Sequence, residues 1–304
     1  MSPKGGTEIQ VAYLEKYVSK TLLNKVQITT SIPEKIPLAA DKLNVLWVHN
    51  SYDQPNLFPW FQNKFNHGKY DWYVFNSHWT YEKYRYFHKI PTEKSLVIKN
   101  GFDDSLIIKQ SFKPKGKTRL IYTSTPWRGL SVLLDAIEQV KSDDVELDIY
   151  SSTQIYGNAF KEATDKEYLH LYDRAKKIKN VNYKGYLDHA ELMKILPIYD
   201  VYVHPSIWEE TSCMAAMEAL ACGLVTVTTD LGALYETCCD FPIYIPYLED
   251  KKLLAQQFAY TIDTLPIIMK DIDENKMKFQ QDYYRQFYHW NVIKGYWENF
   301  LNGI

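Results

Sequence analysis

Two glutamates lie at the ends of one apolar stretch, and their spacing could bring both against a single ligand. Glu210 precedes, and Glu218 lies within, a predicted helix that follows the strand ending at His204. Ser212 can cap the start of this helix, and Gly223 suits the position after its end. The first turn of a helix offers free backbone N–H groups and a partial positive charge. This helix start therefore predicts a site for a phosphate or diphosphate.

The separation of the two glutamates favours an elongated ligand. Along an ideal helix they lie about 12 Å apart on the axis and roughly 80° apart around it. A ligand could meet Glu210 at the helix start and Glu218 along its flank, with a diphosphate between them, and a nucleotide-sugar has that shape. The alternative is two solvated surface carboxylates. Against it, Glu218 interrupts the apolar run Met214–Ala221, where an unpaired carboxylate is costly, so we expect something to hydrogen-bond it.

This stretch resembles the E-x7-E signature of the retaining glycosyltransferases of family 4, the group 1 glycosyltransferases, with Glu210 rather than Glu209 as the first glutamate. Asn100–Asp103 resembles the family's NGxD turn, and Gly5–Glu8 resembles its glycine-rich first loop. Thr229–Glu236 resembles its D-x-G-G-x-x-E turn, with alanine in place of the second glycine. Tyr183–Leu187 and Tyr199–Ser206 resemble two strands that precede the signature. The resemblance implies an α/β chain with the GT-B fold: two Rossmann-like, doubly wound domains facing a central cleft, with the N-terminal domain reduced.

The resemblance also implies which residues act. Glu210 would bind hydroxyls of the donor sugar near the reacting carbon, Glu218 would hold the ribose, and backbone N–H groups of Ser212–Met214 would hold phosphate. The implied donor-binding residues are Gly5, Gly6, Arg128, Glu210, Thr211, Ser212, Cys213, Met214 and Glu218, and those implied for catalysis are Glu210, His49 and Arg128.

Arg128 marks a departure from the family pattern. Family members carry an arginine and a lysine on the first strand–helix turn of the C-terminal domain, where they clamp the leaving diphosphate. Here Arg128 takes the place of the lysine, and Thr123 takes that of the arginine. One arginine can bind a phosphate with two hydrogen bonds, so the clamp is altered and not necessarily lost. The alternative is that Arg128 is an ordinary surface residue before a helix.

His49 is the candidate from the N-terminal half of the chain. It follows the predicted strand Leu43–Val48, and ligands of open parallel sheets bind beyond the carboxyl ends of strands. Relatives in the family often place a histidine near the donor sugar, which implies that role for His49. The alternative is a histidine that only caps a strand end. His78, at another strand end, is a weaker candidate.

The start of the chain departs from the pattern as well. Only Met1–Lys4 precede the glycine pair, whereas a Rossmann-type loop normally follows a buried strand. We expect either a reduced N-terminal sheet or a sequence that begins late. This domain usually recognises the acceptor in the family, so the acceptor stays open: a saccharide, a lipid-linked molecule or another compound.

Neither a metal nor a cofactor is expected, and the nucleotide-diphospho-sugar would act as co-substrate. Asp271–Asp273 matches the D-x-D motif by which the other large glycosyltransferase fold binds manganese, but it is interpreted as a solvated face of the charged helical run Lys270–Lys278. The cysteines have no C-x-x-C pair and no histidine at zinc-site spacing, so we expect buried thiols in a reducing compartment. They are Cys213, Cys222, Cys238 and Cys239.

Alternating apolar runs predict the elements that position these residues. Strand-length runs alternate with helical patterns, which is typical of parallel sheets with helices on both faces. The predicted strands are Val26–Thr30, Leu43–Val48, Trp72–Phe75, Leu96–Ile98, Arg119–Tyr122, Leu147–Tyr150, Val201–His204 and Leu224–Thr228. The predicted helices include Leu130–Val140, Ala190–Leu196 and Met214–Ala221.

A polar stretch, Ser111–Lys117, is the best candidate linker between domains. It predicts an N-terminal domain over residues 1–112 and a C-terminal, nucleotide-sugar-binding domain over 113–282. The aromatic-rich stretch 283–304 is predicted to be helical. It either packs on the C-terminal domain or returns to the N-terminal one, and the two are equally favoured.

Composition sets the broad class of the protein. With 304 residues, 46% hydrophobic and 24% charged, the chain is long enough for two domains and too apolar for wholesale disorder. A formal net charge of -2 provides no global field for nucleic acid, though a local basic patch stays possible. No apolar run reaches the length of a membrane span, and Met1–Gln10 is no signal peptide, so a cytoplasmic protein is expected.

Three hypotheses for function follow. The first is a retaining, metal-independent glycosyltransferase that uses a UDP- or GDP-sugar. The second is a GT-B relative with other chemistry, such as a phosphorylase or a sugar-nucleotide epimerase. A phosphorylase would require a lysine that binds pyridoxal phosphate and a longer chain, and neither is evident here. The third is a non-catalytic nucleotide- or carbohydrate-binding protein, or a partner subunit, suggested by the short N-terminus and the missing diphosphate arginine.

Overall fold

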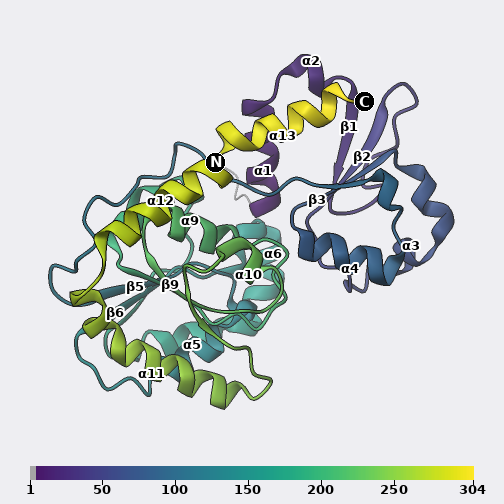
Figure 1. Cartoon of the computed structure of the whole chain (residues 1–304). Coiled ribbons are helices and arrows are strands. Elements are labelled where there is room, and N and C mark those ends of the chain that lie inside the picture. Colours follow the sequence, from purple (N-terminus) through teal and green to yellow (C-terminus); the bar gives the residue numbers. More distant parts are fainter. Residues whose placement is uncertain (1–4) are drawn as a thin grey trace. The chain divides into compact units, whose positions relative to one another are not determined.

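The computed structural model describes residues 5–304, and Met1–Lys4 lie outside the described part. The chain divides into two compact units, each built on a parallel sheet (Figure 1). The larger unit contains Gly5, Asp104–Trp208 and Ala215–Arg285, and the smaller unit contains Gly6–Asp103, Glu209–Met214 and Gln286–Ile304. The first boundary between the units thus falls after Asp103, whereas the sequence analysis predicted that the N-terminal domain ends at residue 112.

The larger unit is a six-stranded, wholly parallel sheet in the order β10-β9-β8-β5-β6-β7. Its strands are β5 (Thr118–Tyr122), β6 (Val145–Ile149), β7 (Val181–Tyr183), β8 (Val201–His204), β9 (Val225–Thr229) and β10 (Ile243–Ile245). Its helices are α5 (Leu130–Ile137), α6 (Asn158–Thr164), α7 (Leu169–Ala175), α8 (His189–Ile195), α9 (Met214–Cys222), α10 (Leu234–Cys238) and α11 (Lys251–Lys270), and α12 (Glu274–Tyr288) begins in this unit and ends in the smaller one.

The order of the strands creates a switch point between β5 and β8. From β5 the chain builds outward through β6 and β7, and it then returns to β8 and builds in the opposite direction through β9 and β10. The central strand β8 is covered on both faces, since all four of its residues are buried. In such sheets ligands bind beyond the carboxyl ends of the strands at the switch point.

The smaller unit is a four-stranded parallel sheet in the order β1-β2-β3-β4. Its strands are β1 (Val26–Thr30), β2 (Leu43–Val48), β3 (Trp72–Phe75) and β4 (Ser95–Val97), and its helices are α1 (Gly6–Tyr17), α2 (Lys20–Leu23), α3 (Phe58–Gln62), α4 (His78–His88) and α13 (Trp290–Asn302). The first element of the described chain is therefore a helix, and the Gly5–Gly6 pair lies at its start rather than after a strand.

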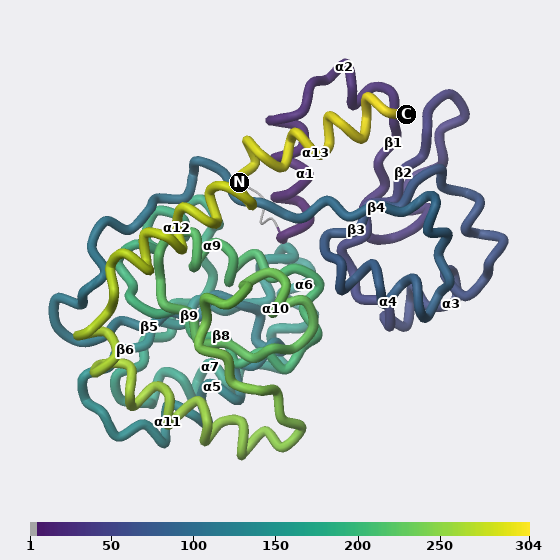
Figure 2. Tube along the Cα trace, in the orientation of Figure 1, coloured from purple at the N-terminus to yellow at the C-terminus, as the bar shows by residue number. Residues whose placement is uncertain are grey.

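Side chains of the central strands alternate between two cores on opposite faces of this sheet. On one face Trp47 packs against Trp297 of α13, with ring centroids 4.9 Å apart, and α1 lies on the same side (Figure 2). On the other face Phe75 packs with Tyr84 of α4, which in turn packs with Phe61 of α3. The C-terminal stretch Gln286–Ile304 thus completes the core of the N-terminal half.

The predicted linker belongs to the larger unit because its neighbours are anchored there. Nζ of Lys109 lies 2.7 Å from Oδ1 of Asp200, and both side chains are buried. The side-chain amide of Gln281 donates to the carbonyl oxygen of Lys109 at 2.9 Å and to that of Cys222 at 2.7 Å. The polar stretch Ser111–Lys117 is consequently a surface connection within this unit.

One further feature differs from the expectations. Asp271–Asp273 lies between α11 and α12, not within a helix, and Oδ1 of Asp273 accepts a hydrogen bond from the backbone N–H of Asn275 at 2.9 Å. No helix of the described residues is long and apolar enough to cross a membrane.

Candidate active site

The switch point of the larger unit holds the first part of the site. The turn after β5 ends in a short 3-10 helix, Pro126–Arg128, followed by Gly129 at φ +126°. A Cβ on Gly129 would overlap the carbonyl oxygen of Pro205, in the loop after β8. Only glycine permits this backbone approach, so the loops after β5 and β8 pack directly against each other.

Arg128 lies next to this contact, directly before Gly129. Its backbone oxygen accepts a hydrogen bond from the N–H of Ile207 at 3.4 Å, and its side chain is half-buried. The side chain has a partner within the protein. The structure thus places Arg128 against the residues that lead from β8 toward Glu210.

Glu218 has the partner that its apolar surroundings demand. It lies in α9 with a relative exposure of 3%, and its Oε1 is 2.7 Å from Nε2 of His189, the first residue of α8. The imidazole N–H donates to the carboxylate, which offsets the cost of burying it. Glycine again ends the helix: Gly223 follows α9 at φ +98°.

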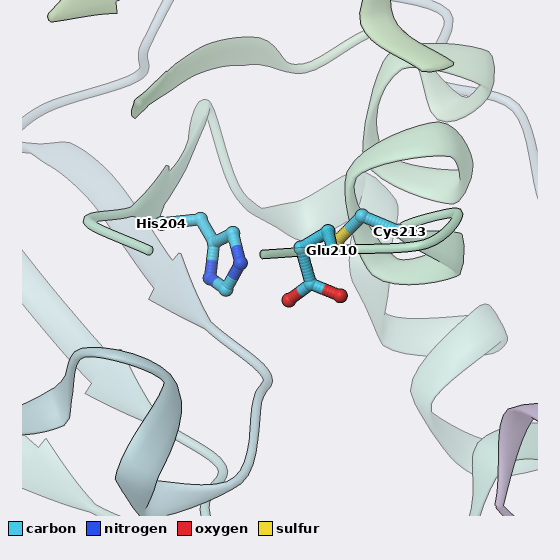
Figure 3. Close-up of side chains that lie close together, drawn as sticks. All are labelled: His204, Glu210 and Cys213. Carbon is cyan, nitrogen blue, oxygen red and sulfur yellow. The ribbon is translucent and has the colours of Figure 1, made fainter. Parts of the chain in front are cut away.

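The loop between β8 and α9 brings together three buried side chains that offer metal-ligand atoms. His204, Glu210 and Cys213 each offer one such atom, and these atoms lie within 4.8 Å of one another (Figure 3). A histidine, a carboxylate and a thiolate are a donor set that suits zinc. Sequence spacing did not indicate this cluster, because its members come from a strand end and from a folded-back loop. Each of the three has partners within the protein.

The start of α9 differs in detail from the prediction. The helix begins at Met214, so Cys213 and not Ser212 directly precedes it. Cys213 is buried, whereas Ser212 is half-exposed one position earlier in the loop. The predicted capping by Ser212 is therefore wrong in register.

The segment Glu209–Met214 is held by hydrogen bonds within the smaller unit. The hydroxyl of Thr211 donates to the backbone oxygen of His49 at 2.8 Å, and its Oγ1 accepts from the side-chain amide of Asn76 at 3.3 Å. The backbone oxygen of Thr211 accepts from the hydroxyl of Thr80 at 3.3 Å. Thr211 is thus tied to the carboxyl ends of β2 and β3.

Two other donor-binding candidates also meet in the smaller unit. The sulfur of Met214 accepts a hydrogen bond from the side chain of Gln10 at 3.3 Å, and a Cβ on Gly6 would lie 3.2 Å from the same sulfur. Gly5 is buried and directly precedes α1. The predicted set therefore includes one pair, Gly6 and Met214, that the fold brings into contact across a long separation in sequence.

His49 is buried directly after β2, and its ring centroid lies 4.6 Å from that of Trp47. Its Nε2 has no hydrogen-bond partner among residues 5–304. Burial lowers the pKa of His49 from 6.5 to about 3, so the ring is neutral at physiological pH. The unpaired Nε2 is itself buried, so its contact with a ligand stays a prediction. His78 is exposed at the start of α4.

A group of side chains on the smaller unit surrounds one lysine. Nζ of Lys83 lies 5.1 to 5.9 Å from the ring centroids of Trp79, Tyr52 and Phe87, and 4.0 Å from Oε1 of Glu209. Burial raises the pKa of Glu209, and the charge of Lys83 opposes that rise. We name these residues the aromatic–lysine cluster. Rings beside paired charges suit a sugar, which stacks its C–H face and hydrogen-bonds its hydroxyls.

Sequence reasoning missed His189, Lys83 and Gln10. For His189 a signal existed, because a carboxylate inside an apolar helix requires a donor, although nothing local pointed to the residue. Lys83 and Gln10 gave no signal, since each contacts residues that are far away in the chain.

Comparison with protein families gives one match. Residues 103–265 match the family model described as glycosyl transferases group 1. No curated protein matches the chain.

Comparison with solved structures gives several matches along most of the chain. The chain is similar to HepE from Anabaena in complex with UDP-glucose, with 17% identity and a TM-score of 0.67, covering 86% of this chain and 73% of that one. It is similar to a glycosyltransferase from Rickettsia africae, with 15% identity and a TM-score of 0.66, covering 100% of this chain and 83% of that one. The chain is also similar to the sucrose-phosphate synthase of Thermosynechococcus elongatus, with 16% identity and a TM-score of 0.65, covering 98% of this chain and 76% of that one. At these identities the likeness concerns the fold.

Proposed function

Because the chain belongs to the group 1 glycosyl transferases, we propose that it is a retaining, metal-independent enzyme that transfers a sugar from a nucleotide-diphospho-sugar to an acceptor hydroxyl. Its fold is GT-B, with two Rossmann-like α/β domains, of which the larger is doubly wound and the smaller has the sequential strand order β1-β2-β3-β4. The observation that carries the proposal is the E-x7-E pair: Glu210 and Glu218 are each 3% exposed, on the loop and helix that follow the switch-point strand β8.

Each end of the donor has candidate residues. Glu218, oriented by His189, would accept hydrogen bonds from the ribose hydroxyls. Backbone N–H groups of Ser212–Met214 and the guanidinium of Arg128 would hold the diphosphate. Glu210 would bind hydroxyls of the sugar, and the unpaired Nε2 of His49 would add a further hydrogen bond there once a small movement of its neighbours exposes it.

The reaction breaks the bond between the anomeric carbon and the diphosphate oxygen and forms one to the acceptor oxygen. Retention follows if the acceptor attacks from the face that the diphosphate leaves, through an oxocarbenium-like state. The acceptor proton then departs with the diphosphate. In this mechanism Glu210 acts by position and charge, not as a nucleophile, and Arg128 stabilises the negative charge of the leaving group.

For the acceptor we propose a saccharide bound at the aromatic–lysine cluster. Tyr52 and Phe87 stack with ring centroids 4.6 Å apart, and 44% of Phe87 is exposed, which leaves ring surface for a sugar. Lys83 and Glu209 offer a donor and an acceptor for its hydroxyls. If so, Phe87→Ala should raise the acceptor KM and leave donor hydrolysis unchanged.

We also propose a cytoplasmic location, since all four cysteines are free thiols, which persist in a reducing compartment.

The first experiment is a thermal-shift screen with UDP, GDP, ADP and their sugars, followed by NMR of the products with the best donor. Stabilisation by one nucleotide, together with donor hydrolysis or transfer that keeps the anomeric configuration, supports the proposal. An inverted anomer would refute the mechanism. Nucleotide binding without any turnover would favour the non-catalytic alternative.

A further inference from the structure

A cavity of about 510 Å³ lies in the larger unit, among residues that the proposed function does not use. Its wall contains five cationic side chains: Lys109, Lys113, Lys115, Lys117 and Arg119. The only acids that line it are Glu146 and Asp200, and Asp200 is already paired with Lys109 at 2.7 Å. Four cations thus face one remaining carboxylate, in a chain whose formal net charge is -2.

Arg119 is the informative member of this group. It is half-buried in β5, and its guanidinium lies 5.3 Å from the ring centroid of Tyr199. Glu146 is its partner in the register of β5 and β6, yet the Glu146 carboxylate instead accepts a hydrogen bond from the amide of Asn182 at 2.9 Å. Among residues 5–304, no carboxylate forms an ion pair with Arg119. A half-buried guanidinium with a stacked ring and no acid is arranged for an external anion.

The three exposed lysines are also available. Lys117 donates to the neutral side-chain oxygen of Asn180 at 3.1 Å, and its charge also acts on Asp143, whose carboxylate is already paired with Lys179 at 2.7 Å. Within the described chain neither Lys113 nor Lys115 forms an ion pair. Their alternating positions on one short surface connection place several ammonium groups around the same cavity. Such a cluster is unfavourable in itself, because like charges repel, and an anion would relieve that repulsion.

The cavity lies at the opposite end of the sheet from the candidate active site. Arg119 and Glu146 stand near the amino ends of β5 and β6, and Asp200 directly precedes β8. The donor-binding residues follow the carboxyl ends of β5 and β8. A five-residue strand spans roughly 16 Å, so one ligand of ordinary size would not fill both places.

We propose that this basic cavity is a second binding site, for an anion that carries phosphate groups. Arg119 binds one phosphate with its two-pronged guanidinium, and Lys113, Lys115 and Lys117 neutralise the rest. The phosphate belongs either to a free phosphorylated compound or to the headgroup of an anionic lipid. The proposal does not depend on the donor site, so either can fail without the other.

The test measures binding of two probes to the full chain carrying Arg128→Ala, which removes the guanidinium proposed to clamp phosphate at the donor site. Calorimetry with inorganic pyrophosphate reports a free ligand. Sedimentation with phosphatidylcholine vesicles, with or without phosphatidylglycerol, reports a lipid headgroup. We expect binding to weaken as salt rises, and at least about a tenfold loss of affinity in a variant that combines Lys113→Gln, Lys115→Gln and Arg119→Gln.

A matched control carries Lys276→Gln and Lys278→Gln, two exposed lysines of α12, and should bind like its parent. Arg119→Lys keeps the charge without the planar guanidinium and should recover part of the affinity. Binding of vesicles alone would assign a headgroup, and binding of pyrophosphate would assign a free ligand. Binding of neither probe, or equal binding by the cavity and control variants, would overturn the proposal.

Discussion

Nε2 of His189 and Oε1 of Glu218 lie 2.7 Å apart, so the second glutamate of the signature is held by a residue of the preceding helix. This bond fixes the carboxylate before any ligand arrives. A preoriented acceptor loses less freedom on binding, which favours affinity for the nucleotide.

We therefore expect Glu218→Ala to weaken binding of both the free nucleotide diphosphate and the sugar nucleotide. Loss of a charge-assisted hydrogen bond is worth about 1.5–3 kcal/mol, or roughly ten- to a hundredfold in Kd. His189→Ala should give a smaller loss of the same kind, because it only frees the carboxylate. Calorimetry measures both, with the exposed His170→Ala as control. Unchanged affinity in folded Glu218→Ala would remove this residue from the site.

Glu210→Gln should act on turnover instead. Its proposed contact is with the sugar alone, so kcat should fall strongly while affinity for the bare nucleotide stays close to that of the unmodified protein. The exposed Glu249→Gln serves as the control. EDTA should leave the rate unchanged. Loss of activity in EDTA that zinc restores would instead assign a metal to the cluster of His204, Glu210 and Cys213. A covalent glycosyl–Glu210 species would contradict the mechanism.

Arg128→Ala should weaken the nucleotide diphosphate and the sugar nucleotide together, by about tenfold or more, since it removes a charge that faces the diphosphate in both. Arg128→Lys should restore part of the affinity but not the two-pronged contact. Titration with UDP, UDP-sugar and uridine tests whether the loss involves the phosphates. Uridine lacks phosphate, so its affinity should be the same for the variant and the unmodified protein. Arg285→Ala, at an exposed position, is the control. A variant that binds every ligand normally would show that Arg128 is only a surface residue.

His49 should make stability depend on pH. Its pKa is about 3 when buried and near 6.5 in the unfolded chain, so between these values only the unfolded chain binds the proton. The contribution to stability is thus lost as pH falls, by about 2 kcal/mol between pH 7 and pH 5. Urea unfolding at both pH values should show a smaller change in His49→Gln, whereas the exposed His78→Gln should behave like the parent. The same pH dependence in all three proteins would mean that His49 is not buried.

Gly129→Ala should destabilise the larger unit. The new methyl group would overlap the carbonyl oxygen of Pro205, and the backbone at φ +126° is unfavourable for alanine, for a total cost of about 3 kcal/mol. Gly185→Ala is the matched control, because Gly185 also has positive φ but open space around it, and its cost should be about 1 kcal/mol. Urea unfolding compares the two. Equal losses would show that the loops after β5 and β8 can separate without cost.

Much of this protein follows from residues that are close in the sequence. The strands Leu43–Val48 and Val201–His204 were predicted with the bounds that the structure has, because an apolar run between polar turns is a local signal. Met214 was likewise predicted as the start of its helix. The E-x7-E spacing and the glycine after the helix are local too, and they were enough to indicate the family.

The tertiary structure decided which distant residues meet. It assigned His189 to Glu218, tied Thr211 to the backbone of His49, placed the predicted linker within the larger unit and gathered four unpaired cations at one cavity. It also lowered the pKa of His49, a shift that depends on how completely other elements exclude water from the ring. Periodicity and spacing describe neighbours along the chain, whereas partner choice and desolvation depend on residues that only folding brings together. These properties therefore had to come from the structure.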